Sequence, residues 1–132
     1  MYMIDANVLL DLLTNDPTWF DWSAGKVKRA RSSGLLVVNP IIYAEISNAF
    51  ATEAELNAYI SPTDFVRTPL PFEAAFLAGR AIRLYRSRGG NKTSPLPDFY
   101  IGAHAEIESL TLVTRDSARY KTYFPKIKLI AP

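Results

Sequence analysis

The chain opens with Met1–Leu13, MYMIDANVLLDLL, a stretch in which an aspartate interrupts an apolar run. Its first part, Tyr2–Ala6, has the continuous apolar character of a short buried strand, and Val8–Leu13 is typical of a helix that follows it. Asp5 therefore falls where the predicted strand ends. Because an isolated carboxylate is costly to bury, this position predicts that a cation or hydrogen-bond donors compensate the charge of Asp5.

Short apolar runs recur along the chain, and helical segments separate them. The strands that we expect are Tyr2–Ala6, Leu35–Val38, Phe65–Arg67, Leu110–Thr114 and Ile127–Ile130. The helices that we expect are Val8–Leu13, Thr18–Ser32, Ile41–Phe50, Glu53–Tyr59, Pro71–Ser87 and Asp98–Glu108. Apolar strands that alternate with helices are typical of a parallel sheet covered on both faces. We therefore predict an α/β, three-layer fold with a parallel sheet of about five strands, in which residues 1–132 form a single domain.

The composition narrows the class of protein. Hydrophobic residues make up 48% of the 132 residues and charged residues 21%, so the chain lacks the composition of a disordered protein. The absence of cysteine excludes a disulfide framework, a thiolate zinc site and a cysteine nucleophile. No signal-peptide pattern and no apolar run of about 18 residues is present, so we expect a cytoplasmic protein without a membrane span.

Basic residues form three clusters, although the formal net charge is only +2. The clusters are Lys26, Lys28, Arg29 and Arg31; Arg80, Arg83, Arg86, Arg88 and Lys92; and Arg115, Arg119, Lys121, Lys126 and Lys128. Each cluster alone is typical of a solvated helix face. Together they are compatible with contacts to the phosphate backbone of a nucleic acid.

Four acidic residues are predicted to meet at one edge of the sheet. Asp5 ends the first strand and Asp116 follows the fourth, so both lie at the carboxyl edge, where open parallel sheets form their sites. Glu45 lies on the apolar stripe of its helix with Ile42, Ile46 and Ala49, rather than on the wet face. Asp98 follows the predicted loop Gly89–Pro97 and opens the next helix, where Gly102 and Ala105 allow close packing.

Each of these carboxylates also has a plainer interpretation. Asp98, Asp116 and Asp5 are each placed to cap a helix, and Glu45 has the option of pairing with a buried arginine. If the four converge instead, their mutual repulsion raises their pKa values or attracts a cation. Oxygen ligands suit Mg²⁺ or Mn²⁺, which activate water and stabilise charge on a phosphoryl group. Asn7 and Thr114 lie two residues from Asp5 and Asp116 and are candidates to orient these ligands, with local capping as the alternative.

The segments around these residues resemble a known family. MIDAN at Met3–Asn7, YAEI at Tyr43–Ile46, LPDFYIGAHA at Leu96–Ala105 and LVTRD at Leu112–Asp116 are similar, in this order, to the four acidic segments of PIN-domain ribonucleases. The size of the chain resembles the VapC-type toxins of prokaryotic toxin–antitoxin pairs. By this resemblance the chain is a Mg²⁺- or Mn²⁺-dependent endoribonuclease that forms a homodimer and is inhibited by a cognate antitoxin.

The resemblance also implies which residues form the site. It places Asp5, Glu45, Asp98 and Asp116 in the catalytic, metal-binding centre, with Thr114 as an accompanying hydroxyl. Many relatives carry an arginine in the loop before the third acidic segment, where Arg88 and Lys92 are the nearest candidates here. The segment Ser117–Tyr120 departs from the family because it offers no second acid after Asp116.

A few other residues have two interpretations. His104, the only histidine, lies on a different helix face from Asp98, which favours a structural role. Trp19, Phe20 and Trp22 are expected either to pack on the sheet or to form an aromatic surface for an antitoxin. Phe72, Phe76, Leu77, Ile82 and Tyr85 are expected in the core or in a dimer contact.

Two other functions compete with the nuclease. A receiver-like signalling module requires an aspartate at the end of the third strand and a lysine at the end of the last, and neither Asp64 nor Lys126 and Lys128 satisfies this. The other alternative is a catalytically inactive PIN-like module that binds RNA or an antitoxin. The presence of all four acidic residues favours the active enzyme.

Overall fold

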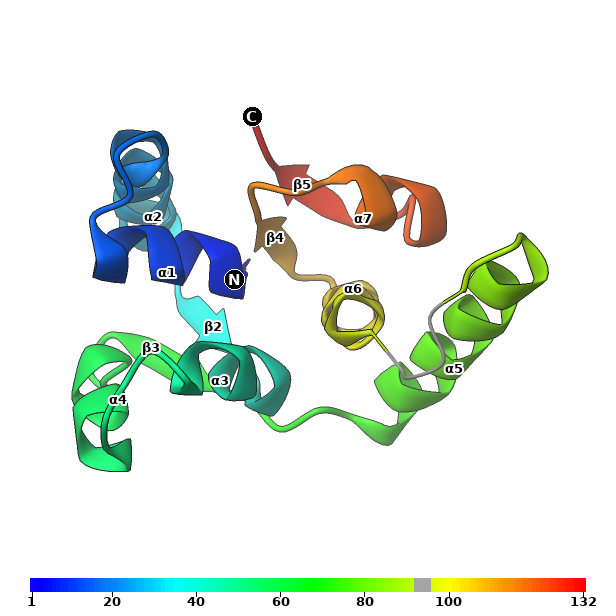
Figure 1. Ribbon diagram of the computed structural model, residues 1–132, viewed down its shortest axis with the longest axis horizontal. Helices are drawn as coiled ribbons and strands as arrows, with labels where there is room; N and C mark the ends of the chain where they lie inside the picture. The colour runs from blue at the N-terminus through cyan, green and yellow to red at the C-terminus, as the bar shows by residue number, and fades with distance from the viewer. Residues whose placement is uncertain (92–95) are drawn as a thin grey trace.

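The computed structural model describes residues 1–91 and 96–132 and is built around one parallel sheet (Figure 1). The strands are Tyr2–Ile4 (β1), Leu36–Val38 (β2), Phe65–Arg67 (β3), Thr111–Val113 (β4) and Lys128–Ile130 (β5). They lie in the order β3-β2-β1-β4-β5, with Met3 paired to Val37 on one side and to Leu112 on the other. This confirms the predicted α/β fold, and each strand lies within its predicted segment.

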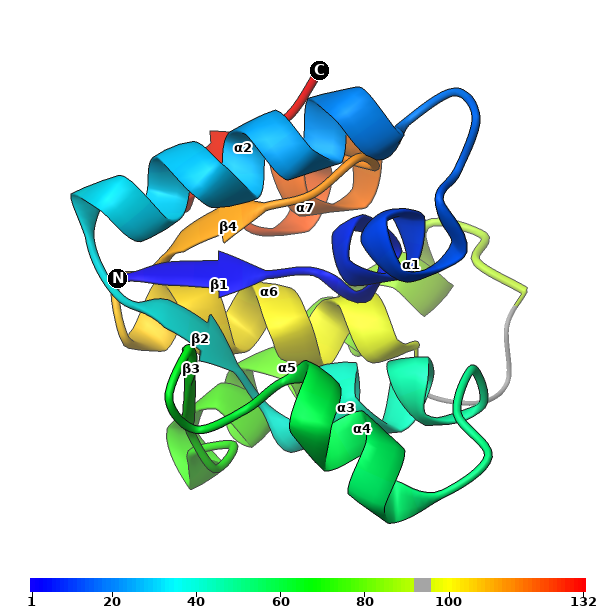
Figure 2. The same ribbon diagram turned by 90° about the vertical axis from the view of Figure 1, so that its left-hand side faces the viewer.

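Helices cover both faces of this sheet. The helices are Ala6–Thr14 (α1), Phe20–Ser33 (α2), Pro40–Ser47 (α3), Glu53–Tyr59 (α4), Phe72–Ser87 (α5), Pro97–Ile107 (α6) and Ala118–Tyr123 (α7). Figures 1 and 2 show α1 and α2 on one face and α5, α6 and α7 on the other, with α6 between the sheet and α5. Met3, Val37 and Leu112 are fully buried between these layers, which explains the continuous apolar runs.

The order of the strands reverses between β1 and β4. From β1 the chain moves to β2 and β3, and it then returns across the sheet to β4 and β5. Ligand sites in open α/β sheets lie at such a switch point, beyond the carboxyl ends of the strands. Asp5 lies at this switch point, directly after β1, and its backbone N–H donates to Val113 O of β4 at 2.9 Å. The first and fourth strands are therefore neighbours, which the sequence alone did not establish.

The structure differs from the predicted helices in three places. Helix α7 was not predicted, because its six residues are too few to give a clear apolar period. Helix α3 ends at Ser47, so Ala49 lies outside it and is exposed. Pro97 belongs to the first turn of α6 rather than to the preceding loop, as a residue without a backbone N–H readily does.

The described helices include none that is both long and apolar enough to cross a membrane.

The helices α6 and α7 approach each other closely at Gly102. A Cβ atom at this position would overlap with the ring of Phe124, which directly follows α7 and is almost fully buried. The absence of a side chain at Gly102 therefore sets the distance at which α7 rests on α6. The close packing predicted for this face of the helix is confirmed.

Gly102→Ala is expected to lower the free energy of unfolding by about 1–3 kcal/mol, because the buried Phe124 ring has to move. Gly79→Ala is the matched control, since Gly79 lies in α5 with open space around it. There the same change is expected to stabilise the helix by about 0.5–1 kcal/mol. Urea unfolding of both variants measures the difference, and equal effects at the two glycines would contradict this packing.

Candidate functional site

Asp5 serves both the local structure and the site, with a different oxygen for each. It is the N-cap of α1, and its Oδ1 accepts from Ala6 N at 2.7 Å. Its Oδ2 accepts from Thr114 Oγ1 at 2.8 Å and lies 3.0 Å from the Tyr120 hydroxyl. Only 4% of Asp5 is exposed. The capping interpretation is therefore confirmed for this residue, and its second oxygen faces the other side chains of the candidate site.

Asp98 lies in the first turn of α6, where the positive end of the helix dipole favours a negative charge. Its carboxylate contacts α7 rather than capping its own helix. Oδ1 lies 3.3 Å from the Tyr120 hydroxyl, and Oδ2 accepts from Arg119 Nη1 at 3.2 Å. Asp98 and Asp5 thus share one phenolic hydroxyl, although 93 positions separate them in the sequence (98 − 5).

Glu45 projects from α3 toward the same region. Ile42 and Ile46, which share its helix face, are fully buried, and Glu45 itself is half-buried. Its Oε1 is shielded from solvent and has no hydrogen-bond partner among the described residues, so the structure offers no support for a buried arginine partner. A surface hollow lined by Ile41, Ala44, Pro97 and Tyr100 opens beside Glu45. Glu45 is thus the least satisfied carboxylate of the four.

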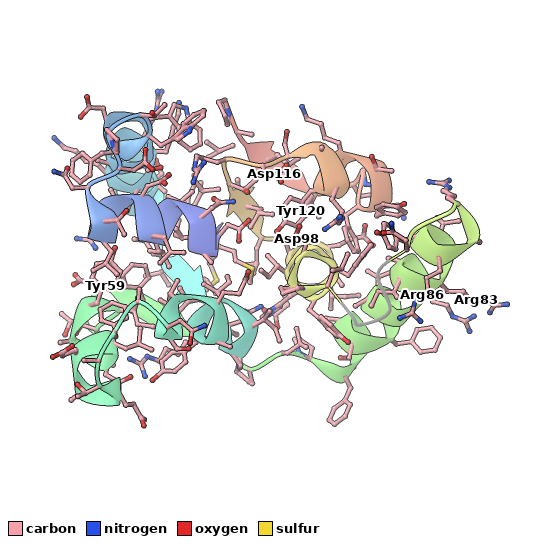
Figure 3. The ribbon with its side chains drawn as sticks, viewed as in Figure 1. Tyr59, Arg83, Arg86, Asp98, Asp116 and Tyr120 are labelled. Atoms are coloured by element: carbon pink, nitrogen blue, oxygen red, sulfur yellow. The ribbon has the colours of Figure 1, made fainter. Side chains whose placement is uncertain are left out.

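Asp116 lies at the rim of the site. It is exposed, its N–H donates to Thr114 Oγ1 at 3.2 Å, and its Oδ1 accepts from Ala118 N at 3.4 Å. Its negative charge raises the pKa of Asp98. Figure 3 shows Asp98, Tyr120 and Asp116 close to one another near α6 and α7. The structure therefore brings Asp5, Glu45 and Asp98 together and leaves Asp116 beside them.

Asn7 and Thr114 connect the ends of β1 and β4. Asn7 Nδ2 lies 3.2 Å from Thr114 Oγ1, and Asn7 Oδ1 accepts from Arg115 N at 3.1 Å. Thr114 is fully buried, and its hydroxyl donates to Asp5. Thr114 therefore contacts Asp5 directly and Asn7 contacts the Thr114 hydroxyl, while their role in orienting a metal ligand stays a prediction.

The sequence did not predict the two residues of α7 that touch the carboxylates, Arg119 and Tyr120. The ring of Tyr120 is almost fully buried. Its hydroxyl faces the carboxylates of Asp5 and Asp98. A single O–H hydrogen lies between two carboxylates, so only one of them accepts it at a time. Burial and the charges of Asp5 and Asp98 raise the pKa of Tyr120, so the phenol keeps its proton.

His104 has a structural role, as its helix face predicts. Its Nδ1 lies 3.0 Å from Asn39 Nδ2, and its Nε2 lies 3.0 Å from Glu108 Oε2. Asn39 also caps α3, with its Oδ1 accepting from Ile42 N at 2.9 Å. Since the amide nitrogen of Asn39 donates to Nδ1, Nε2 carries the proton toward Glu108. The Asn39–His104 contact joins the helix that carries Glu45 to the helix that carries Asp98.

Burial and mutual repulsion raise the pKa values of the inner carboxylates. Burial raises the pKa of Glu45 to about 7, and the charges of Asp5 and Asp98 add to the effect. Burial also raises the pKa of Asp5 against the hydrogen bonds from Thr114 and Tyr120, which lower it. The pKa of Asp98 is raised by burial, although Arg119 and Tyr120 oppose the increase. A cation at this place would relieve the repulsion.

The donor set fits a metal ion that keeps part of its water. Within residues 1–91 and 96–132, no three acidic or histidine side chains are grouped closely enough to enclose an ion. Mg²⁺ commonly uses one or two carboxylates and completes its octahedron with water and substrate phosphates. Asp5 and Asp98, which share the Tyr120 hydroxyl, would supply those two carboxylates, and their hard oxygen atoms are the appropriate ligands.

The other residues that the sequence singled out are a basic pair that precedes α6 and aromatic residues of α2 and α5. Arg88 lies over the Tyr123 ring, with its guanidinium carbon 5.7 Å from the ring centroid, and Lys92 falls outside the described residues. Trp19 and Trp22 are half-buried in an edge-to-face pair, and Arg115 covers Trp19. Of the aromatic residues on α5, Phe72 and Phe76 are 92% and 66% exposed, so both lie outside the core of this chain.

The basic clusters differ in their surroundings. Lys28, Arg29 and Arg31 are exposed on α2. Figure 3 shows Arg83 and Arg86 on the outer helix α5, away from Asp98. Arg115 is instead paired with Asp11, its Nε 2.8 Å from Oδ2, although the N–H is not aimed for a hydrogen bond. Lys28, Arg29 and Arg83 are therefore exposed on α2 and α5, whereas Arg115 is half-buried against Asp11.

The sequence of the chain matches a known family. The chain matches the PIN domain family over residues 2–125 and therefore belongs to it. The family membership predicted from the four acidic segments is thus confirmed. No protein with a curated description matches the chain.

Several solved structures share the fold. VapBC2 from Rickettsia felis, bound to a DNA fragment from its promoter, is similar with a TM-score of 0.75 and 17% identity, over 99% of this chain and 98% of that one. DNA-bound VapBC from Salmonella typhimurium has a TM-score of 0.70 at 19% identity, over 98% and 96% of the two chains. VapBC-1 from nontypeable Haemophilus influenzae has a TM-score of 0.71 at 21% identity, with the same two coverages.

Glu45→Gln is expected to remove a pH dependence of stability. Because the folded pKa of about 7 exceeds the ordinary 4.5, the folded protein binds more protons, and its stability falls as pH rises from about 4.5 to about 7. Without metal at pH 7.5, the variant should be more stable than wild type by about 1 kcal/mol, a value discounted for solvent around the half-buried side chain. At pH 4 this difference should vanish.

Urea unfolding in EDTA across this pH range measures the effect. The control is Glu106→Gln, near the other end of α6, which should follow the wild-type pH profile. The prediction would be contradicted if the free energy of unfolding of wild type rose from pH 4.5 to pH 7 and Glu45→Gln showed the same rise.

Tyr120→Phe is expected to destabilise the metal-free protein by about 1–3 kcal/mol, because it removes the donor between two charged groups and keeps the buried ring. Tyr123→Phe is the control, since Tyr123 contributes its ring to contacts with Tyr85 and Phe99. Thermal unfolding in EDTA distinguishes the two. If both phenylalanine variants unfold with wild type, the shared hydroxyl is not a stabilising contact.

Proposed function

We propose that this chain is a Mg²⁺- or Mn²⁺-dependent endoribonuclease, of the VapC toxin type, that hydrolyses RNA phosphodiesters at the carboxyl edge of its sheet. One observation carries the proposal: Asp5 and Asp98 come from different elements and share the Tyr120 hydroxyl at the switch point, beside the unpartnered Glu45. Membership of the PIN-domain family supports it. The similarity to VapBC structures supports the toxin class.

Each acidic residue has a proposed role. Asp5, Glu45, Asp98 and Asp116 would hold the metal, which supplies activation of water and neutralises charge on the phosphoryl group. Thr114 would orient Asp5 directly, and Asn7 would do so through the Thr114 hydroxyl. The Tyr120 hydroxyl keeps Asp5 and Asp98 close together before RNA binds. Without metal, burial raises the pKa of Glu45 to about 7, and a bound cation would favour its charged form.

The proposed partners are RNA, a second copy of the chain and a cognate antitoxin in the cytoplasm. The exposed basic faces of α2 and α5 suit contacts to an RNA backbone. The exposed Phe72 and Phe76 give α5 an apolar face that suits a protein contact. The neighbouring structures of the VapBC kind are the reason to propose an antitoxin.

The alternative is a catalytically inactive PIN-like module that binds RNA or an antitoxin. Arg119 favours it to some degree, because a guanidinium that pairs with Asp98 reduces the negative charge available for a metal. The same RNA cleavage experiment separates the two functions.

Cleavage of total tRNA and rRNA by the purified chain, without antitoxin, tests the proposal. Cleavage is expected with Mn²⁺ or Mg²⁺ and not with EDTA, and Asp98→Asn should reduce it by at least about 100-fold. Asp64→Asn is the matched control, since Asp64 is exposed before β3 and pairs with Arg31. It should cleave as wild type does.

Single-stranded DNA of the same length separates an RNase from a general nuclease. If folded wild type leaves RNA intact with either metal, the enzyme is excluded and the binding module is the better proposal. If Asp98→Asn cleaves RNA as fast as wild type, the nuclease activity does not come from this site.

A further inference from the structure

An arginine of the chain itself occupies one oxygen of the central carboxylate. Arg119 Nη1 lies 3.2 Å from Asp98 Oδ2, and the two side chains are 31% and 30% exposed. The other oxygen of Asp98 faces the Tyr120 hydroxyl at 3.3 Å. Both oxygens of Asp98 are therefore already paired by two consecutive residues of α7.

The guanidinium is held from more than one side. Its carbon lies 5.5 Å from the ring centroids of Tyr85 and Phe99, which come from α5 and α6. The faces of aromatic rings attract a guanidinium, so Arg119 keeps favourable contacts even without Asp98. The side chain also reaches solvent, so it has room to leave the carboxylate without unfolding α7.

A divalent ion at Asp98 would need the same oxygen and would carry the same sign of charge. At a short distance a cation of charge +2 and a guanidinium repel each other, and this repulsion is weakened only in part by solvent. Metal and guanidinium therefore compete for Asp98.

We propose that Arg119 is a built-in counter-ion of the acidic site, which pairs with Asp98 when no metal is bound and which a divalent metal has to displace. This rests on the proposed function, since it takes Asp98 as a metal ligand. Arg119 is thus a positioning residue that sets the metal concentration at which the site fills. In the metal-free protein it also offsets the charge of Asp98.

Titration of the purified chain with Mn²⁺, followed by the electron paramagnetic resonance of the free ion, tests the proposal. Arg119→Gln should bind Mn²⁺ about threefold to tenfold more tightly than wild type. Arg119→Lys keeps the charge and should stay near wild type. Arg31→Gln removes an arginine that is paired with Asp64 before β3, and it controls for net charge.

A second measurement needs no change at the site. The Nε–H resonance of Arg119, assigned from its loss in Arg119→Gln, should shift on addition of Mg²⁺ to wild type, whereas that of Arg31 should stay. Unchanged Arg119 resonances at saturating Mg²⁺, or Arg119→Gln binding Mn²⁺ no more tightly than wild type, would overturn the proposal.

Asp98→Asn distinguishes this failure from failure of the proposed function. If Asp98→Asn loses Mn²⁺ binding while Arg119→Gln leaves it unchanged, only the counter-ion role is wrong. If Asp98→Asn binds Mn²⁺ as wild type does, the carboxylate is not a metal ligand, and the counter-ion role and the metal-dependent nuclease site are both overturned.

Discussion

Repulsion between buried carboxylates is the constraint around which this end of the molecule is built. Burial raises the pKa values of Asp5, Glu45 and Asp98, and repulsion adds to it: Asp98 raises the pKa of Asp5, and both aspartates raise the pKa of Glu45. Hydrogen-bond donors and one cation compensate part of this charge: Thr114 and Tyr120 donate toward Asp5, and Arg119 pairs with Asp98. Of these three carboxylates, Glu45 alone keeps a shielded oxygen without a hydrogen-bond partner among the described residues. Carboxylates with strongly perturbed pKa values are common at functional sites, and a bound cation would relieve the repulsion here.

The topology explains why these particular residues meet. The strand order reverses between β1 and β4, so the residues that follow these two strands face each other across the switch point. Asp5 and Thr114 are those residues. The helices α3 and α6 are held in register by the contact between Asn39 and His104, which fixes Glu45 relative to Asp98. Gly102 lets α7 approach α6 closely enough for its side chains to reach the acids.

The sequence predicted the strands of the sheet and the candidate acidic residues, but not the residues of α7 that contact them. Each predicted strand contains the observed one, because strands buried on both faces leave uninterrupted apolar runs. Glu45 was identifiable because it interrupts the apolar face of a helix. Tyr120 and Arg119 were not, because α7 is short and its residues are ordinary for a surface segment. Their role depends on a contact between α7 and α6 that only the packing around Gly102 and Phe124 reveals.

The central claim is that the carboxyl edge of the sheet holds a divalent metal between Asp5 and Asp98. A crystal structure of the chain grown with Mn²⁺, with anomalous diffraction to locate the ion, tests it most directly. We expect an anomalous peak about 2.0–2.3 Å from an Asp98 oxygen, with the Arg119 guanidinium moved off that carboxylate. A folded structure at saturating Mn²⁺ with no peak between Asp5 and Asp98, and with Arg119 still paired to Asp98, would contradict the claim.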